Sequence, residues 1–133
     1  MKVLLDTNIC IYMMKNNPPE VRKHFERFSP GEVCISSITV AELRYGVEKS
    51  AARERNASAL EAFLLPLEII SFDLNDALAY GNIRTNLKRQ GTPIGSMDML
   101  IAAQSVVREL TLITNNIKEF QRIPSLRCEN WVQ

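Results

Sequence analysis

Three acidic residues stand at positions where a charged side chain is costly to place. Asp6 ends the apolar run Val3-Leu4-Leu5, and Glu42 and Asp98 each fall at the expected start of a helix within an apolar stretch. A carboxylate at the edge of a core segment loses hydration unless a positive group joins it. A divalent metal is the simplest such group, and carboxylates with a metal can hydrolyse phosphodiesters.

Each acid also has a purely structural interpretation. Thr39 and Glu42 have the spacing of a capping box, in which Thr39 is the N-cap and Glu42 reaches back to its amide. The same idea covers three further stretches: Asp6 as a cap for the Ile9 amide, Ser96 as a cap ahead of Asp98, and Asn116 as a cap ahead of Glu119. Taken singly, each acid is therefore weak evidence for catalysis.

The combination of Asp6 and Asp98 favours a functional site. Asp98 precedes the apolar residues 99–103, which must be packed, and Asp6 lies between two apolar runs. Two carboxylates held at the edges of core segments have perturbed surroundings, as functional groups often do. We expect Asp6 and Asp98 to share one site.

The elements that would position these acids alternate between strands and helices. We predict strands at residues 3–5, 33–36, 67–71, 111–113 and 127–131, and helices at residues 9–15, 20–28, 40–50, 53–64, 75–90, 97–109 and 117–121. The first four strands are mostly apolar, which is typical of a parallel sheet covered on both faces. Ligands of such sheets bind beyond the carboxyl ends of the strands, where Asp6 and residues 114–116 would lie.

The chain lacks the residues that other hydrolytic mechanisms need. His24 is its one histidine and lies in a charged helical segment, where we expect it to be solvated. This excludes a paired-histidine ribonuclease and disfavours a serine–histidine–acid triad. No phosphate-binding glycine loop is present. Carboxylates with Mg²⁺ or Mn²⁺ remain as the expected apparatus.

Composition sets further bounds. The chain has 133 residues, of which 46% are hydrophobic and 23% charged, and its net charge is +1. We expect residues 1–133 to form one domain without a membrane span or signal peptide, and therefore to be cytoplasmic. Three widely spaced cysteines indicate reduced core thiols. Without a basic excess, RNA binding would need a local patch, such as Arg84 and Lys88 on one helix face, although such a stripe is often only solvated.

Four motifs, in order and along almost the whole chain, resemble VapC-type toxins of the PIN-domain ribonuclease family. They are Leu4-Leu5-Asp6-Thr7-Asn8, Ile38-Thr39-Val40-Ala41-Glu42-Leu43 with Gly46, residues 93–103 around Asp98, and Leu112-Ile113-Thr114-Asn115-Asn116 with Glu119-Phe120. The resemblance implies a PIN-like α/β three-layer sandwich, in which helices flank a central parallel sheet of four or five strands. It also implies a Mg²⁺-dependent endoribonuclease that inhibits translation, with Mn²⁺ as a substitute metal.

The resemblance also implies roles and partners. Asp6, Glu42 and Asp98 would be catalytic, and Asp6 and Asp98 would be the metal ligands. Thr7 and Asn8 would support Asp6, and Ser96, Asn116 and Glu119 would assist. The expected partners are tRNA, with cleavage of initiator tRNA in the anticodon loop as in a similar subgroup, a VapB-like antitoxin whose tail fills the active-site groove, and a second copy of the chain in a homodimer.

One residue departs from the family pattern. Many relatives carry an aspartate where this chain has Asn116, so a second metal site is in doubt, and Glu119 is the residue that would supply the missing charge. Two other functions stay open on the residues alone. They are a receiver-like phosphotransfer pocket, which usually needs paired acids and a late lysine, and a non-catalytic interaction module in which the acids only cap helices.

Overall fold

The strands form one parallel sheet at the centre of the molecule. The structure, a computed structural model, describes residues 2–132. Within them the sheet has the strand order β3-β2-β1-β4-β5. The strands are β1 Val3–Leu5, β2 Val33–Ser36, β3 Glu68–Ile70, β4 Thr111–Ile113 and β5 Arg127–Glu129. Every neighbouring pair is parallel, as strands joined through helices require.

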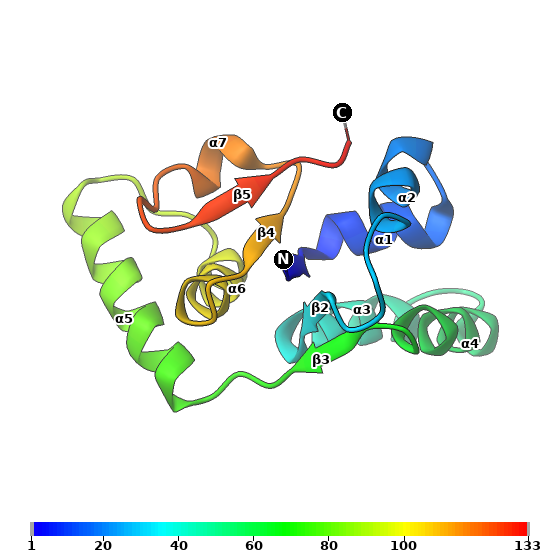
Figure 1. The fold of residues 1–133 in the computed structure, drawn as a ribbon. Helices are drawn as coiled ribbons and strands as arrows, with labels where there is room; N and C mark the ends of the chain where they lie inside the picture. Colours follow the sequence, from blue (N-terminus) through cyan, green and yellow to red (C-terminus); the bar gives the residue numbers. More distant parts are fainter. Residues whose placement is uncertain (1, 133) are drawn as a thin grey trace.

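Helices cover both faces of this sheet (Figure 1). They are α1 Thr7–Lys15, α2 Pro19–Phe25, α3 Ser37–Glu48, α4 Arg53–Leu64, α5 Leu74–Arg89, α6 Ser96–Val107 and α7 Ile117–Phe120. Helices α1 to α4 lie on one side of the sheet, while α5, α6 and α7 lie on the other. The predicted three-layer α/β sandwich is confirmed.

The short strands are buried on both faces, which explains their continuous apolar sequences. In β1, Val3 and Leu5 face the core beneath α1 to α4, while Leu4 faces the core beneath α5 and α6. All three are fully buried. Burying one such side chain contributes about 1.5–3 kcal/mol, so both cores hold the central strand in place.

Among the described residues, five of the seven helices begin one to three residues before the predicted residue, and α3 shows the largest difference. Helix α3 begins at Ser37 instead of residue 40, because the Ser36 hydroxyl accepts a hydrogen bond from the Ile38 amide and caps the helix. Helix α6 begins at Ser96, with Gly95 as its N-cap and no side-chain cap. The predicted bounds of β1, β2, β4 and α4 agree with the structure.

Other expectations from the sequence concern single features. Gly91 follows α5 with a φ of 69°, a left-handed conformation that favours glycine and ends the helix. Cys10, Cys34 and Cys128 are free. None of the helices within residues 2–132 is long and apolar enough to cross a membrane. The face of α4 that carries Leu60 packs against the chain's own core.

Candidate active site

The register of the sheet places the carboxyl ends of β1, β2 and β4 side by side. Leu5 pairs with Ile35 on one side and with Ile113 on the other. The residues that follow them therefore lie next to one another, with Asp6 between Ser36 and Thr114. The Asp6 amide continues the ladder by donating to the Ile113 carbonyl at 3.0 Å. This carboxyl end of the sheet is where parallel α/β proteins bind ligands.

Asp6 both caps a helix and belongs to this polar edge. Its Oδ1 accepts a hydrogen bond of 2.9 Å from the Ile9 amide, so the predicted cap of α1 is confirmed. Its side chain is 6% exposed. Burial raises the pKa of Asp6 above its ordinary value, a hydrogen bond from Thr114 and the Ile9 amide oppose that rise, and the charge of Glu42 adds to it. Desolvation therefore destabilises the charged form of Asp6, whereas the hydrogen-bond donors around it stabilise that form.

Asp98 lies in the first turn of α6, and the charges of the other acids at this edge of the sheet affect its pKa. Its pKa is raised to about 6, first by burial and then by the charges of Glu119, Asp6 and Glu42. Like charges raise a carboxyl pKa only where they lie near one another. Carboxylates from four separate parts of the chain therefore lie near one another, which supports the prediction that Asp6 and Asp98 share one site.

The capping interpretation of Glu42 is wrong. Thr39 lies inside α3, so it is not the N-cap, and the Glu42 side chain does not return to its amide. Instead, Glu42 Oε1 accepts a hydrogen bond of 2.7 Å from the Thr7 hydroxyl. The supporting role expected of Thr7 is corrected as well, because its hydroxyl contacts Glu42 and not Asp6.

Asn116 and Glu119 form a pair at the end of β4. The Asn116 side-chain amide donates to Glu119 Oε2, and Asn116 makes no side-chain cap of α7. Asn116 thus stands at the N-cap position of α7 as expected, but its side chain does not make the capping hydrogen bond. Glu119 also exerts the largest charge effect on the Asp98 pKa, ahead of Asp6. Its carboxylate lies where it can add the charge that Asn116 lacks.

Thr114 is a further residue of the site; the sequence pattern predicted its place at this edge of the sheet but no role for it. It is fully buried, its side chain hydrogen-bonds Asp6, and its Oγ1 accepts from the Asn116 amide at 3.0 Å. It thereby links Asp6 to the Asn116–Glu119 pair. Its place directly after an apolar strand, in register with Asp6, was the available signal.

The remaining predicted residues lie at the margin of the site. Asn8 is exposed, and it supports Asp6 through its backbone amide. Ser96 is exposed as the first residue of α6, so its predicted role as N-cap is wrong. His24 stacks on Trp131 with ring centroids 5.7 Å apart instead of being only solvated.

The donor set fits a hard cation that keeps part of its water shell. Carboxylate oxygens are the ligands that Mg²⁺ and Mn²⁺ prefer, and Mg²⁺ usually takes one or two of them together with waters and substrate phosphate. Within residues 2–132, no group of three or more His, Cys, Asp or Glu side chains is close enough to enclose an ion. One or two of these carboxylates, together with waters, would supply the ligands of such an ion, and a cation would relieve the repulsion on Asp98.

An apolar cavity adjoins the acids. It has a volume of about 370 Å³ and lies between α1, α3 and α4. Thr7 and Glu42 line it together with Lys15 and Asn56, and Gly46 lines it with nothing within 4 Å of where a Cβ would stand. The acidic site thus continues into a groove that an apolar side chain could enter.

Comparison with known proteins identifies the family. The PIN-domain profile matches residues 3–126. The chain is 46% identical over 131 residues to the tRNA(fMet)-specific endonuclease VapC of Salmonella typhimurium, covering 98% of each chain. It is 46% identical over 129 residues to ribonuclease VapC2 of Rickettsia felis, covering 96% of each. The crystal structure of VapBC2 from Rickettsia felis bound to a promoter DNA fragment matches with a TM-score of 0.92 and 45% identity, covering 98% of this chain and 99% of that one.

The chain therefore belongs to the PIN-domain family, among its VapC ribonucleases, and is an endoribonuclease. Nucleases of this family are metal-dependent, which agrees with the carboxylate donor set. The receiver-like and non-catalytic alternatives are thereby set aside.

The raised pKa of Asp98 predicts how acid affects the stability of the metal-free protein. Because the folded-state pKa of about 6 lies above the ordinary 3.8, the folded protein binds more protons than the unfolded chain between these values. The contribution of Asp98 to the free energy of unfolding therefore increases as the pH falls through about 6, and it decreases as the pH rises. We expect Asp98→Asn to be more stable than the wild type at about pH 7.5 and nearly equal to it at about pH 4.

Chemical denaturation of both proteins in EDTA across this pH range measures the difference. Taking the difference removes the contributions of groups that the two proteins share. Adding Mn²⁺ should stabilise the wild type at neutral pH more than the variant. A stability difference that stays constant with pH would contradict the assignment of Asp98.

Proposed function

We propose that this chain is the toxin of a type II toxin–antitoxin pair and inhibits translation by cleaving tRNA. Initiator tRNA, cut in the anticodon loop, is the expected target. The proposal is supported by the 46% identity to an endonuclease named for tRNA(fMet). The observation that carries the chemistry is the polar edge of the sheet, where Asp6 lies between Ser36 and Thr114 and the Thr7 hydroxyl beside Asp6 binds Glu42. The charges of Glu119, Asp6 and Glu42 raise the pKa of Asp98, which agrees with four acids lying near this edge.

Within this proposal Asp6, Glu42 and Asp98 are catalytic, and Asp6 and Asp98 hold Mg²⁺, with Mn²⁺ as a substitute. A bound ion of this kind makes water more acidic and offsets the charge that develops on the phosphate. The chain's own residues supply the geometry. Thr114 and the Ile9 amide hold Asp6, and Glu42 orients water from α3.

Asn116 and Glu119 act as supporting residues. A neutral amide is a weaker ligand than a carboxylate, so the site holds one metal tightly, and a second arrives only with substrate. The hydrogen bond from the Asn116 amide to Glu119 supports a single tightly held metal, because both side chains are bound to each other. Asn8 and Ser96 support the site from its margin.

Incubation of the purified chain with mixed tRNA and Mg²⁺ tests the function. Sequencing of the new RNA ends should find one position in initiator tRNA, and EDTA should abolish the cut. Intact initiator tRNA beside cleavage of another RNA would replace the target and keep the nuclease. No cleavage of any RNA by the metal-loaded protein would overturn the proposal.

The partner that fits the groove is an antitoxin of the VapB kind. Its apolar side chains would fill the cavity beside Gly46, and an arginine would reach Glu42 and the acids behind it. The groove's apolar walls and the Glu42 carboxylate that lines it support this match. The gene next to this chain's own should encode such a small DNA-binding protein, and adding that protein should stop cleavage. We also propose that residues 1–133 act as one nuclease domain and that the chain forms a homodimer. The proposed location is the cytoplasm, where tRNA lies.

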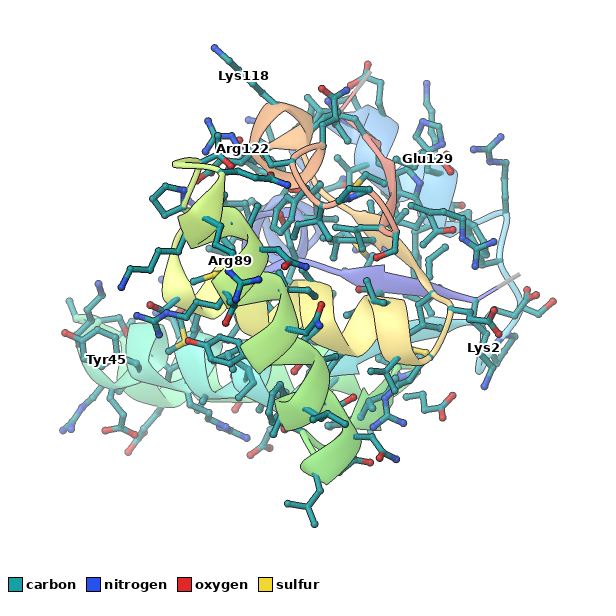
Figure 2. All side chains as sticks on the ribbon, turned by 90° about the vertical axis from the view of Figure 1, so that its left-hand side faces the viewer. Lys2, Tyr45, Arg89, Lys118, Arg122 and Glu129 are labelled. Carbon is teal, nitrogen blue, oxygen red and sulfur yellow. The ribbon has the colours of Figure 1, made fainter. Side chains whose placement is uncertain are left out.

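Arg84 and Lys88 are proposed to contact the RNA backbone. Both are exposed on α5, while Ile83 and Leu87 on its inner side are buried. Figure 2 shows α5 crossing in front of α6, with the neighbouring Arg89 labelled. Replacing both Arg84 and Lys88 by glutamine should weaken binding and reduce the log–log salt slope by about 0.7 to 0.9 for each phosphate that is no longer neutralised.

Cleavage rates measured over a series of salt concentrations provide the test. Replacing the exposed Arg53 and Arg55 on α4 by glutamine removes the same charge elsewhere and should leave the slope unchanged. If the two double variants have the same slope as the wild type, α5 does not contact RNA.

A further inference from the structure

Thr7 connects two acids of the site that are far apart in the sequence. It follows Asp6 directly and is the first residue of α1. Its hydroxyl donates to Glu42 Oε1 at 2.7 Å, across a sequence separation of 35 residues, and the contact is partly buried. The backbone that fixes Asp6 as a helix cap therefore also fixes the hydroxyl that holds Glu42.

This hydrogen bond restrains a side chain that would otherwise be mobile. A glutamate loses considerable rotamer freedom when it is held in one conformation, so a helix-surface glutamate seldom points one way without a partner. The Thr7 hydroxyl occupies Oε1 and leaves Oε2 for other contacts. The charge of Glu42 contributes to the raised pKa of both Asp6 and Asp98, so the restrained carboxylate lies near them.

We propose that Thr7 is a positioning residue for the nuclease reaction, acting through Glu42. Its hydroxyl holds the Glu42 carboxylate near Asp6 and Asp98, so that the free oxygen can orient water at the site. Outer partners of this kind typically affect metal affinity or activity about 10–100-fold. The inference rests on the proposed function, which it deepens by assigning Thr7 a role that acts through Glu42.

Two variants of Thr7 separate a positioning role from a structural one. Thr7→Val keeps the branched shape and removes the donor, whereas Thr7→Ser keeps the donor and removes the methyl group. We expect Thr7→Val to lower both Mn²⁺ affinity, measured by calorimetry, and RNA cleavage by about 10–100-fold. We expect Thr7→Ser to restore both quantities to near the wild-type level, while urea unfolding midpoints stay close for all three proteins.

A double-mutant cycle with Glu42 tests the route of the effect. In a Glu42→Ala background, which removes the acceptor, Thr7→Val should cause little further loss, because residues that act as one unit are not additive. Thr7→Val with wild-type Mn²⁺ affinity and cleavage would overturn the positioning role, as would an equal loss in both backgrounds. A wild type that neither binds Mn²⁺ nor cuts RNA would instead overturn the proposed function, and the role of Thr7 with it.

Discussion

Asp98→Asn is expected to lower the rate of RNA cleavage about a thousandfold or more, since metal stabilisation of the transition state amounts to several kcal/mol. The substitution removes one of the two proposed metal ligands and keeps the shape of the side chain. It also removes a carboxylate that burial and three neighbouring acids disfavour, so the variant should stay folded. Single-turnover cleavage of tRNA at saturating Mg²⁺, with circular dichroism as a folding check, measures both effects.

Two matched variants sharpen this experiment. Glu109→Gln removes an exposed charge beyond the far end of the same helix and should leave cleavage unchanged. Asp6→Asn should abolish cleavage as Asp98→Asn does, while an asparagine oxygen can still cap α1 in place of Asp6 Oδ1. Cleavage by either site variant at the wild-type rate would show that these carboxylates do not form the active site.

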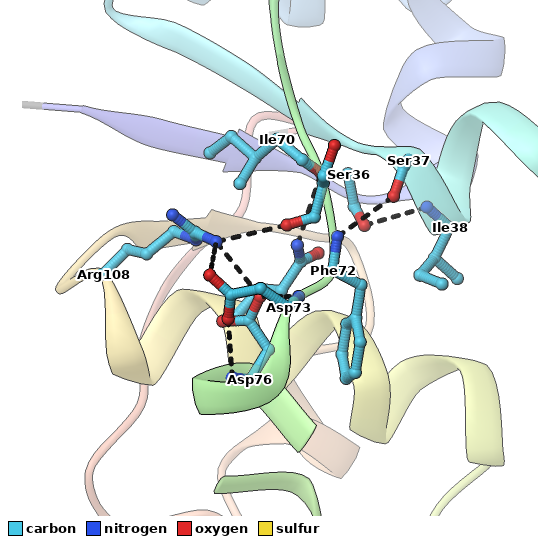
Figure 3. Close-up of polar contacts among 10 residues, drawn as sticks. Ser36, Ser37, Ile38, Ile70, Phe72, Asp73, Asp76 and Arg108 are labelled. Atoms are coloured by element: carbon cyan, nitrogen blue, oxygen red, sulfur yellow. Dashed lines mark hydrogen bonds and ion pairs between the residues drawn. The ribbon is translucent and has the colours of Figure 1, made fainter. Parts of the chain in front are cut away.

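Arg108→Met is expected to destabilise the fold by about 3 kcal/mol, the lower end of the cost of breaking a buried ion pair. Arg108 Nη2 lies 3.1 Å from Asp76 Oδ2 and 3.3 Å from Asp73 Oδ2, and it also donates to the Ser71 carbonyl at 3.2 Å (Figure 3). Asp76 is fully buried, so without the guanidinium its charge has no cationic partner among these contacts. The loss should be large because a buried, unpaired carboxylate cannot be rehydrated.

Urea denaturation measures this loss, and an exposed pair provides the control. Arg44 and Glu61 lie 3.8 Å apart with side chains 44% and 69% exposed, so Arg44→Met should change stability by less than about 1 kcal/mol. A double variant, Arg108→Met with Asp76→Asn, should recover part of the loss, because it removes the unpaired charge. Equal effects of Arg108→Met and Arg44→Met would mean that the buried pair adds no special stability.

The pattern of apolar residues was sufficient to predict the architecture. Strands β1, β2 and β4 are short, continuously apolar and bounded by turn or helix residues, so the type and extent of each could be predicted from local sequence. Asp6 and Asp98 could be placed in one site for a related reason. Each carboxylate interrupts a segment that must be buried, and parallel strands put their carboxyl ends at one edge.

The helix starts and the partners of the acids depend on contacts between distant residues. Around α3, Ser36 and Thr39 are both good N-cap residues by type, and Ser36 becomes the cap because β2 ends there. The bond from Thr7 to Glu42 and the pairing of Thr114 with Asp6 join segments whose separation in the chain leaves no periodic signal. Local sequence determines which segments become strands and helices, whereas the register of the folded sheet determines which polar atoms meet, because only packing sets the distances between them.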